Sequence, residues 1–171
     1  MKKLIVVMLG LVLTVLFLSA AFAEIRTDYL TVSATLVPSC TVSATSINFG
    51  DTGGAEDVFA NGSVTVNCDS GTTYEIGLNE GLHYIEGGYF WRCMESNSHL
   101  LQYRLYISDP GNYLYEWGNT CSTNTYNKGV CNSGTGTGAN QEYIVYGLVN
   151  SFYSMLPPGV YTDTVTVEVV Y

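Results

Sequence analysis

The sequence predicts an all-β protein, and three observations carry this prediction. The chain contains 14 Tyr and 18 Gly together with many Thr and Val, a composition that favours strands and turns over helices. Short runs of alternating apolar and polar residues recur between clusters of Gly, Asn, Asp and Ser. No stretch has a clear amphipathic helical period over three turns. We therefore expect antiparallel strands in a single domain.

Residues 1–23 have the pattern of a secretory signal peptide. Lys2 and Lys3 give a positive start, residues 4–18 are almost purely apolar, and residues 21–23 form an A-x-A cleavage site. The apolar run is about 15 residues long, which is short for a membrane span of roughly 20 residues. A retained anchor is the alternative. We expect cleavage after Ala23 and export of a mature chain of residues 24–171.

The predicted mature chain is strongly acidic. Cleavage after Ala23 would leave four Lys and Arg residues against fifteen Asp and Glu, a net charge of −11. This charge disfavours electrostatic binding to nucleic acid or to anionic lipid. The remaining length is typical of one domain with its own core.

Six segments beyond the first cysteine have the length and pattern of strands. They are residues 40–50, 64–68, 74–78, 101–107, 143–149 and 159–171. An immunoglobulin-like sandwich of two sheets needs about seven strands, so the count is one short. Residues 87–97 are ambiguous. Residues 116–142 are rich in Gly, Ser, Thr and Asn, and they predict an exposed loop or an irregular hairpin.

The last of these segments predicts a sheet edge that another element must cover. Its apolar residues alternate with Thr and Glu, and its last eight residues contain neither Lys nor Pro. Soluble proteins usually cover or blunt an apolar edge of this kind. The residues expected to border the open edge are Tyr161, Val165, Val167, Val169 and Tyr171.

A further strand pattern precedes the first cysteine. The even positions Leu30, Val32, Ala34 and Leu36 are apolar and the residues between them are polar, while Pro38 interrupts the ladder. One interpretation is that this segment folds back as the first strand of its own domain. The other is that it completes a neighbouring copy by β-augmentation.

Five cysteines in an exported protein predict disulfides and one remaining thiol. Cys40 opens one predicted strand and Cys68 closes the next, so the two are expected to pair. Cys121 and Cys131 flank a polar loop and form the second expected pair. Cys93 either stays a buried thiol or replaces one of the loop cysteines. A zinc site is the competing interpretation, but no C-x-x-C spacing occurs.

The sequence contains no recognisable catalytic or cofactor motif, and we expect neither an enzyme nor a bound metal or cofactor. His83 and His99 stand outside any motif and are expected at the surface. The aromatic run at residues 89–91 is expected to fill a core or an interface, with sugar stacking as the alternative. Asn61 begins a lone glycosylation sequon.

Taken in order, these segments resemble the spore coat protein U domain, the pilin fold of archaic chaperone–usher pili. The most specific features of this resemblance are the spacing from Cys40 to Gly50, the V-T-V-x-C around Cys68 and the G-x-Y-x-D-T that opens the last strand. The stretches that carry the resemblance are PSCTVSATSINFG, NGSVTVNCDSGTTYEIGL, LLQYRLYIS, EYIVYGLV and PPGVYTDTVTVEVVY.

The resemblance implies an incomplete immunoglobulin-like sandwich that is completed by a donor strand from a neighbouring subunit. Such pilins are held by a periplasmic chaperone until the N-terminal strand of the next subunit replaces it at the outer-membrane usher. Residues 24–38 would then be the donor strand and its hinge, and residues 39–171 the pilin domain. Leu30, Val32, Ala34 and Leu36 would form the donor face, and Cys40–Cys68 the family disulfide.

Two functions follow as alternatives. The favoured one is a structural subunit of an adhesive surface pilus that supports adhesion or biofilm formation, with other pilin subunits, the chaperone and the usher as partners. One domain with a donor strand fits a shaft or adaptor subunit. The alternative is a self-contained secreted binding module, for a glycan or as a coat component, that does not polymerise. Cys93, Cys121 and Cys131 are extra to the family pattern.

Overall fold

The computed structural model describes residues 23–52, 56–85, 91–109, 115–119, 121, 129–151 and 155–171. The chain divides into two units, residues 1–35 and residues 36–171, and all the strands belong to the second. They are β1 (Cys40–Ala44), β2 (Val58–Cys68), β3 (Thr73–Leu78), β4 (Tyr84–Ile85), β5 (Trp91–Ser96), β6 (His99–Tyr106), β7 (Asn132–Thr135), β8 (Gln141–Val149) and β9 (Val167–Val170).

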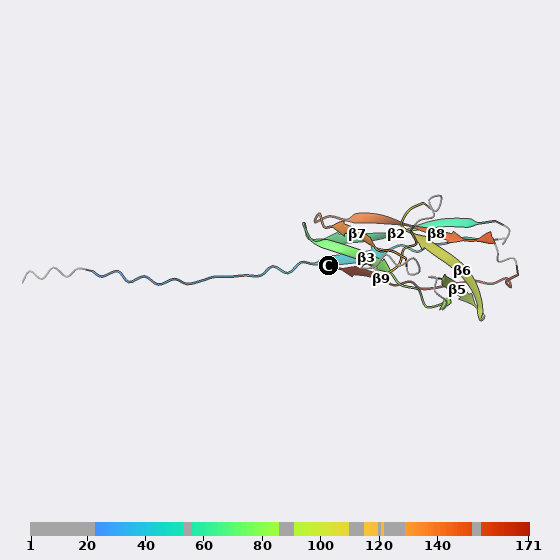
Figure 1. Ribbon diagram of the computed structural model, residues 1–171, viewed down its shortest axis with the longest axis horizontal. Coiled ribbons are helices and arrows are strands. Elements are labelled where there is room, and N and C mark those ends of the chain that lie inside the picture. The colour runs from blue at the N-terminus through green and yellow to red at the C-terminus, as the bar shows by residue number, and fades with distance from the viewer. Residues whose placement is uncertain are drawn as a thin grey trace, which may run out of the picture. The chain divides into compact units, whose positions relative to one another are not determined.

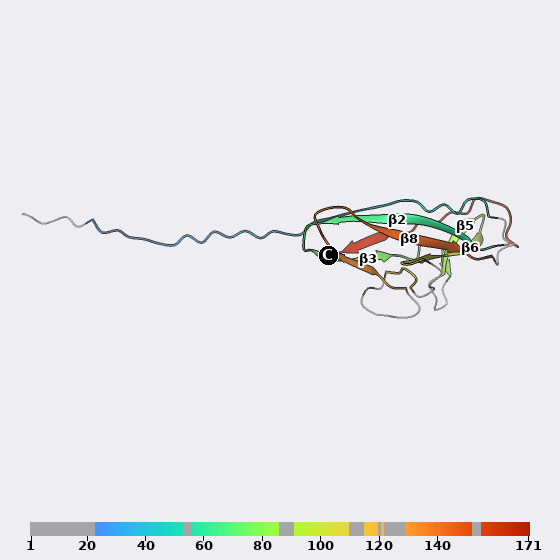
Figure 2. The same cartoon turned by 90° about the horizontal axis from the view of Figure 1, so that it is seen from above.

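These strands form two antiparallel sheets that pack into an immunoglobulin-like sandwich. The larger sheet has the order β1-β2-β8-β6-β5-β4, and the smaller has the order β7-β3-β9. Figure 1 labels β2, β8, β6 and β5 of the larger sheet and all the strands of the smaller one. In Figure 2, β2 and β8 lie on one side of β3, as expected for two layers. The all-β fold predicted from composition and periodicity is therefore confirmed.

The core lies between the sheets and follows the period-2 pattern of the sequence. In β2, Val64 and Val66 are at most 1% exposed, and in β3, Ile76 and Leu78 are at most 2% exposed. Thr65, between the two valines, is only half-buried, and Glu75, before Ile76, is exposed, because neighbouring side chains of a strand point to opposite faces. Strands β6 and β8 add Leu105 and Val145 among others to the same core cluster.

The ambiguous segment at residues 87–97 contains a strand. β5 pairs with β6 through a hairpin in which Ser96 lies opposite His99. The two loop residues, Asn97 and Ser98, both have positive φ angles of 47° and 66°, as a two-residue type I′ turn requires. The short strand β4 then pairs with β5. Residues 89 and 90 of the aromatic run lie outside the described residues.

The polar segment at residues 116–142 is predicted as an exposed loop or an irregular hairpin, but its described parts include a buried side chain and a strand. Trp117 is completely buried, and its Nε1 donates a hydrogen bond to the Ile76 carbonyl (2.9 Å). Strand β7, which lies within this segment, pairs with β3. Tertiary contacts therefore place part of a segment of loop-like composition in the core and in the smaller sheet.

The N-terminal part of the chain contains no strand among its described residues. Residues 23–39 lie outside every strand, although residues 28–37 have a strand pattern. The predicted signal peptide lies almost entirely outside the described residues. Within the described part, no helix is long and apolar enough to cross a membrane.

Candidate functional site

One edge of strand β1 is open in the described part of the domain. β1 is the first strand of its sheet and pairs only with β2. The Thr45 amide donates to the Ser63 carbonyl of β2 (2.9 Å). Because the backbone groups of successive strand residues point to opposite sides, those of Val42 and Ala44 point away from β2. These groups are available to a further strand.

The last strand has a second open edge. β9 ends the smaller sheet and pairs with β3. Just before β9, the Thr166 carbonyl accepts from the Asn79 amide (3.0 Å), and the Thr166 amide donates to the Asn79 side chain (2.8 Å). By the same alternation, the backbone groups of Val165 and Val167 point away from β3.

Side chains that face the core along both open edges are only partly covered. Val42 lies opposite the fully buried Val66 in the β1–β2 register, yet it is 44% exposed. Val165, Val167 and Val169 are half-buried, although they occupy the inward-facing positions of the last strand. Inward positions of a complete sandwich are normally covered. The core is therefore incomplete between the two edges.

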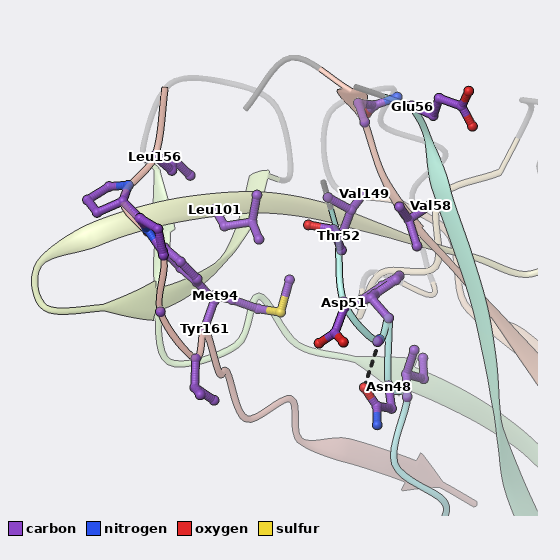
Figure 3. A pocket seen from close by; sticks show the side chains of 18 residues that line it. Asn48, Asp51, Thr52, Glu56, Val58, Met94, Leu101, Val149, Leu156 and Tyr161 are labelled. Carbon is purple, nitrogen blue, oxygen red and sulfur yellow. Dashed lines mark hydrogen bonds between the residues drawn. The ribbon is translucent and has the colours of Figure 1, made fainter. Parts of the chain in front are cut away.

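A groove lies at the gap in the core. It consists of two hollows of about 580 Å³ and about 670 Å³ whose walls share Ile47, Phe49, Met94 and Tyr161. The smaller hollow extends along the last strand to Val167. Figure 3 shows the larger hollow, into which the Met94 side chain points. Residues of the predicted acceptor edge and residues of the core therefore line the same groove.

The floor of the groove is apolar. Val64, Leu78, Leu105 and Val145 line the smaller hollow, and all four are at most 5% exposed. The Phe49 ring lies over this floor, tilted against the Tyr103 ring with centroids 6.4 Å apart. An extended apolar segment would cover these side chains and satisfy the open backbone groups at once.

Arg92 is a buried cation behind the groove. It is completely buried on β5, and its guanidinium donates to the carbonyls of Leu78 (2.9 Å), Asn79 (2.8 Å) and Trp117 (2.7 Å). Burial lowers the pKa of Arg92 to about 10, so the side chain remains protonated at neutral pH. One side chain therefore joins β5, the end of β3 and the 116–119 segment. The sequence analysis did not single out this residue.

Both expected disulfides are present. Cys40–Cys68 joins the start of β1 to the end of β2, and Cys121–Cys131 closes the polar loop. Cys93 is a completely buried thiol and replaces neither loop cysteine. Burial raises its pKa, which keeps it protonated and unreactive. Cysteines joined in these two disulfides are not available as thiolate ligands for zinc.

His83 lies in a polar cluster at the partly exposed surface. Its Nε2 lies 2.7 Å from Glu95 Oε2, and its Nδ1 lies 3.3 Å from Asp163 Oδ1. Its side chain is only 33% exposed. Residue spacing could not reveal this cluster because the three residues come from three distant segments. No group of His, Cys, Asp and Glu within the described residues could hold a metal ion.

The predicted donor and acceptor residues lie in different parts of the chain. Leu30, Val32, Ala34 and Leu36 are exposed in the segment without strands, and Leu30 and Leu36 are 89% and 97% exposed. Of the predicted acceptor residues, Tyr161, Val165 and Val167 line the groove. Val169 is half-buried on β9, and Tyr171 is exposed at the end of the chain.

These features define an immunoglobulin-like sandwich domain with one open strand position. The Spore Coat Protein U domain family matches residues 26–168. The chain therefore belongs to this family. No curated protein sequence gives a significant match.

A solved structure has a similar fold. It is a chain in the crystal structure of the CsuC–CsuE chaperone–tip adhesion subunit pre-assembly complex from archaic chaperone–usher Csu pili of Acinetobacter baumannii. The two sequences are 26% identical and the TM-score is 0.53. The match covers 80% of this chain but only 40% of that chain.

Proposed function

We propose that this chain is a structural subunit of an adhesive surface pilus, assembled through the chaperone–usher pathway by donor-strand exchange. The observation that carries the proposal is the pair of open edges with half-buried inward side chains. Val42 lies on one of these edges and Val165 and Val167 lie on the other, and no described strand pairs with the open side of either edge. Membership of the Spore Coat Protein U domain family and the similarity to a chaperone–usher pilus complex support the same function.

The exposed N-terminal segment has the chemistry that the groove requires. Its apolar residues Leu30, Val32, Ala34 and Leu36 fall on one face of an extended chain. At about 3.3 Å per residue, the stretch from Leu30 to Leu36 is about 20 Å long, and the edge from Tyr161 to Val169 is about 26 Å long. The donor face is therefore short enough to lie wholly within the acceptor edge.

The energetics require hydrogen bonds as well as apolar burial. Covering Leu30, Val32 and Leu36 contributes about 1.5–3 kcal/mol for each side chain. Ordering the donor costs about 1–2 kcal/mol per residue in backbone entropy, which over the seven residues from Leu30 to Leu36 offsets all of this gain or more. Ladder hydrogen bonds to the open edges add about 0.5–1.5 kcal/mol each. A donor that fills only part of the groove would bind weakly.

The partners follow from this mechanism. A subunit with an open core needs a periplasmic chaperone before assembly, an outer-membrane usher during assembly and other pilin subunits in the fibre. Export with cleavage after Ala23 would deliver the chain to the periplasm and then to the cell surface. In the fibre, its role would be adhesion or biofilm formation as a shaft or adaptor subunit.

A self-contained binding module is the competing function. It requires the N-terminal segment to close its own sandwich. The exposure of Leu30, Val32 and Leu36, each at least 86%, favours donation to another copy. A chain that closed its own core would be a stable monomer at all concentrations.

A peptide-capture experiment tests the proposal. A variant that lacks residues 24–37 should be unable to polymerise but should still bind a synthetic peptide of residues 28–37. Val32→Asp in the peptide should abolish capture because it places an unpaired charge in an apolar groove. Ser33→Asp is the matched control, since residue 33 lies on the opposite face of an extended strand. If the shortened chain is a stable monomer that ignores the peptide, donor-strand exchange is wrong.

A further inference from the structure

Asp163 places a buried carboxylate in the wall of the groove. It occupies an inward-facing position of the acceptor edge, between Tyr161 and Val165, and its side chain is only 3% exposed. A buried carboxylate is costly unless several donors satisfy it. An apolar side chain at this position would have suited the core equally well. The presence of a carboxylate at this position is explained by the hydrogen bonds that it accepts.

The Asp163 carboxylate binds two segments that do not belong to its own strand. Oδ1 accepts hydrogen bonds from the backbone amides of Leu82 (3.0 Å) and His83 (3.3 Å). Oδ2 accepts from the Tyr103 hydroxyl (2.6 Å) on β6. Burial, followed by this hydrogen bond, raises the pKa of Tyr103, which keeps the hydroxyl a donor. One side chain thus ties the acceptor edge to the loop before β4 and to the floor of the groove.

The loop that Asp163 binds is shaped around the carboxylate. Gly81 has a φ of +84°, a conformation that favours glycine. A Cβ at this position would also collide with the Asp163 side chain. The far end of the loop is fixed in turn, because the His83 carbonyl accepts from the Cys93 amide of β5 (2.8 Å). The loop that donates to the Asp163 carboxylate is therefore itself fixed, by the Gly81 conformation and by the hydrogen bond between His83 and Cys93.

The acceptor edge has little other support at this point. Thr162 exchanges two backbone hydrogen bonds with Glu95 of β5 (2.9 and 3.2 Å). Regular pairing with β3 begins only with Val167. Between these points the chain crosses from one sheet to the other, and Asp163 and the Asn79–Thr166 bonds hold it. This crossing lies directly beside the smaller hollow of the groove.

We propose that Asp163 is a positioning residue that holds the acceptor edge in the position that can receive a donor strand. This inference rests on the proposed function. With its carboxylate bound, the edge from residue 161 to residue 165 stays extended and apart from β1. Without it, two unpaired apolar edges would be free to approach each other and close the groove. The effect on donor capture is then one of preorganisation, since only the open form can accept a strand.

The test uses the full chain in a Val32→Asp background, which cannot donate a strand but keeps its groove. The chain is refolded at low concentration and mixed with a labelled peptide of residues 28–37. Asp163→Ala is expected to slow capture by about tenfold or more, as a shift of the open population to one tenth would. Glu168→Ala is the matched control on the same edge, because it also removes a carboxylate, but Glu168 is exposed and lines neither hollow of the groove, and it should leave the rate unchanged.

Amide hydrogen exchange provides a readout that does not depend on the peptide. Asp163→Ala should speed exchange at Leu82, at His83 and at the hydrogen-bonded edge amides of Thr162 and Thr166, while β2 and β8 keep their protection. If Asp163→Ala prevents folding, Tyr103→Phe removes a single donor to the carboxylate and should give a smaller slowing of capture. An unchanged capture rate in a folded Asp163→Ala chain, or unchanged exchange at the Thr162 and Thr166 amides, would overturn the positioning role. If the parent chain captures no peptide, the proposed function fails, and the exchange data still decide the role of Asp163.

Discussion

The two disulfides should differ in what they contribute to stability, and the structure gives the size of the difference. Cys40 and Cys68 are 28 residues apart, whereas Cys121 and Cys131 are 10 apart. The loop-closure entropy of the unfolded chain gives about 3.6 kcal/mol for the first bridge and about 2.7 kcal/mol for the second. Cys68 is also 1% exposed, so its truncation adds a packing defect in the core.

Paired alanine variants measure this difference. Cys40→Ala with Cys68→Ala should lower the free energy of unfolding by about 1 kcal/mol more than Cys121→Ala with Cys131→Ala. Urea unfolding, followed by fluorescence of the buried Trp117, is measured at one saturating concentration of donor peptide so that the stabilisation by the peptide cancels. If the loop pair costs as much as the core pair, or more, the reasoning from loop length and burial is refuted.

The remaining predictions concern the core and the open edge. Arg92→Met should cost at least about 3 kcal/mol in urea unfolding, because it leaves two buried carbonyls and one partly buried carbonyl without this donor. A loss below about 1 kcal/mol would mean that other groups satisfy them. The chain expressed without a chaperone should aggregate or be degraded, since the edge around Val165 and Val167 is an apolar template for association. Abundant soluble monomer under these conditions, measured by size-exclusion chromatography, would instead support the self-contained module.

Periodicity predicts most of this fold because most strands have one face in the core. The alternation around Val66 and Ile76 places both residues correctly in the interior. The sequence pattern of β5 is ambiguous because one of its inward-facing residues is the charged Arg92. Its guanidinium can be buried only because carbonyls of other segments accept its hydrogen bonds. β7 has almost no apolar signal in Asn132–Thr135, and its pairing with β3 depends on contacts distant in sequence.

The candidate site was predictable in part for the same reason. The apolar alternation of the last strand identified Val165 and Val167, which do line the groove. Asp163 could not be identified, since its role depends on a loop about 80 residues earlier in the chain. The opposite open edge, at Val42, could be identified only from the β1–β2 register. The N-terminal strand pattern forms no strand in the structure because an isolated strand has no ladder to satisfy its backbone.

Backbone protection of the two open edges is the most direct test of donor-strand exchange. Amide hydrogen exchange at Val42, Ala44, Val165 and Val167 should be fast in the variant that lacks residues 24–37. In polymers of the full chain, or after the variant binds the peptide of residues 28–37, these four amides should become slow to exchange, because a new strand pairs with both edges. Polymers in which the four amides still exchange as fast as in the open subunit would contradict the account.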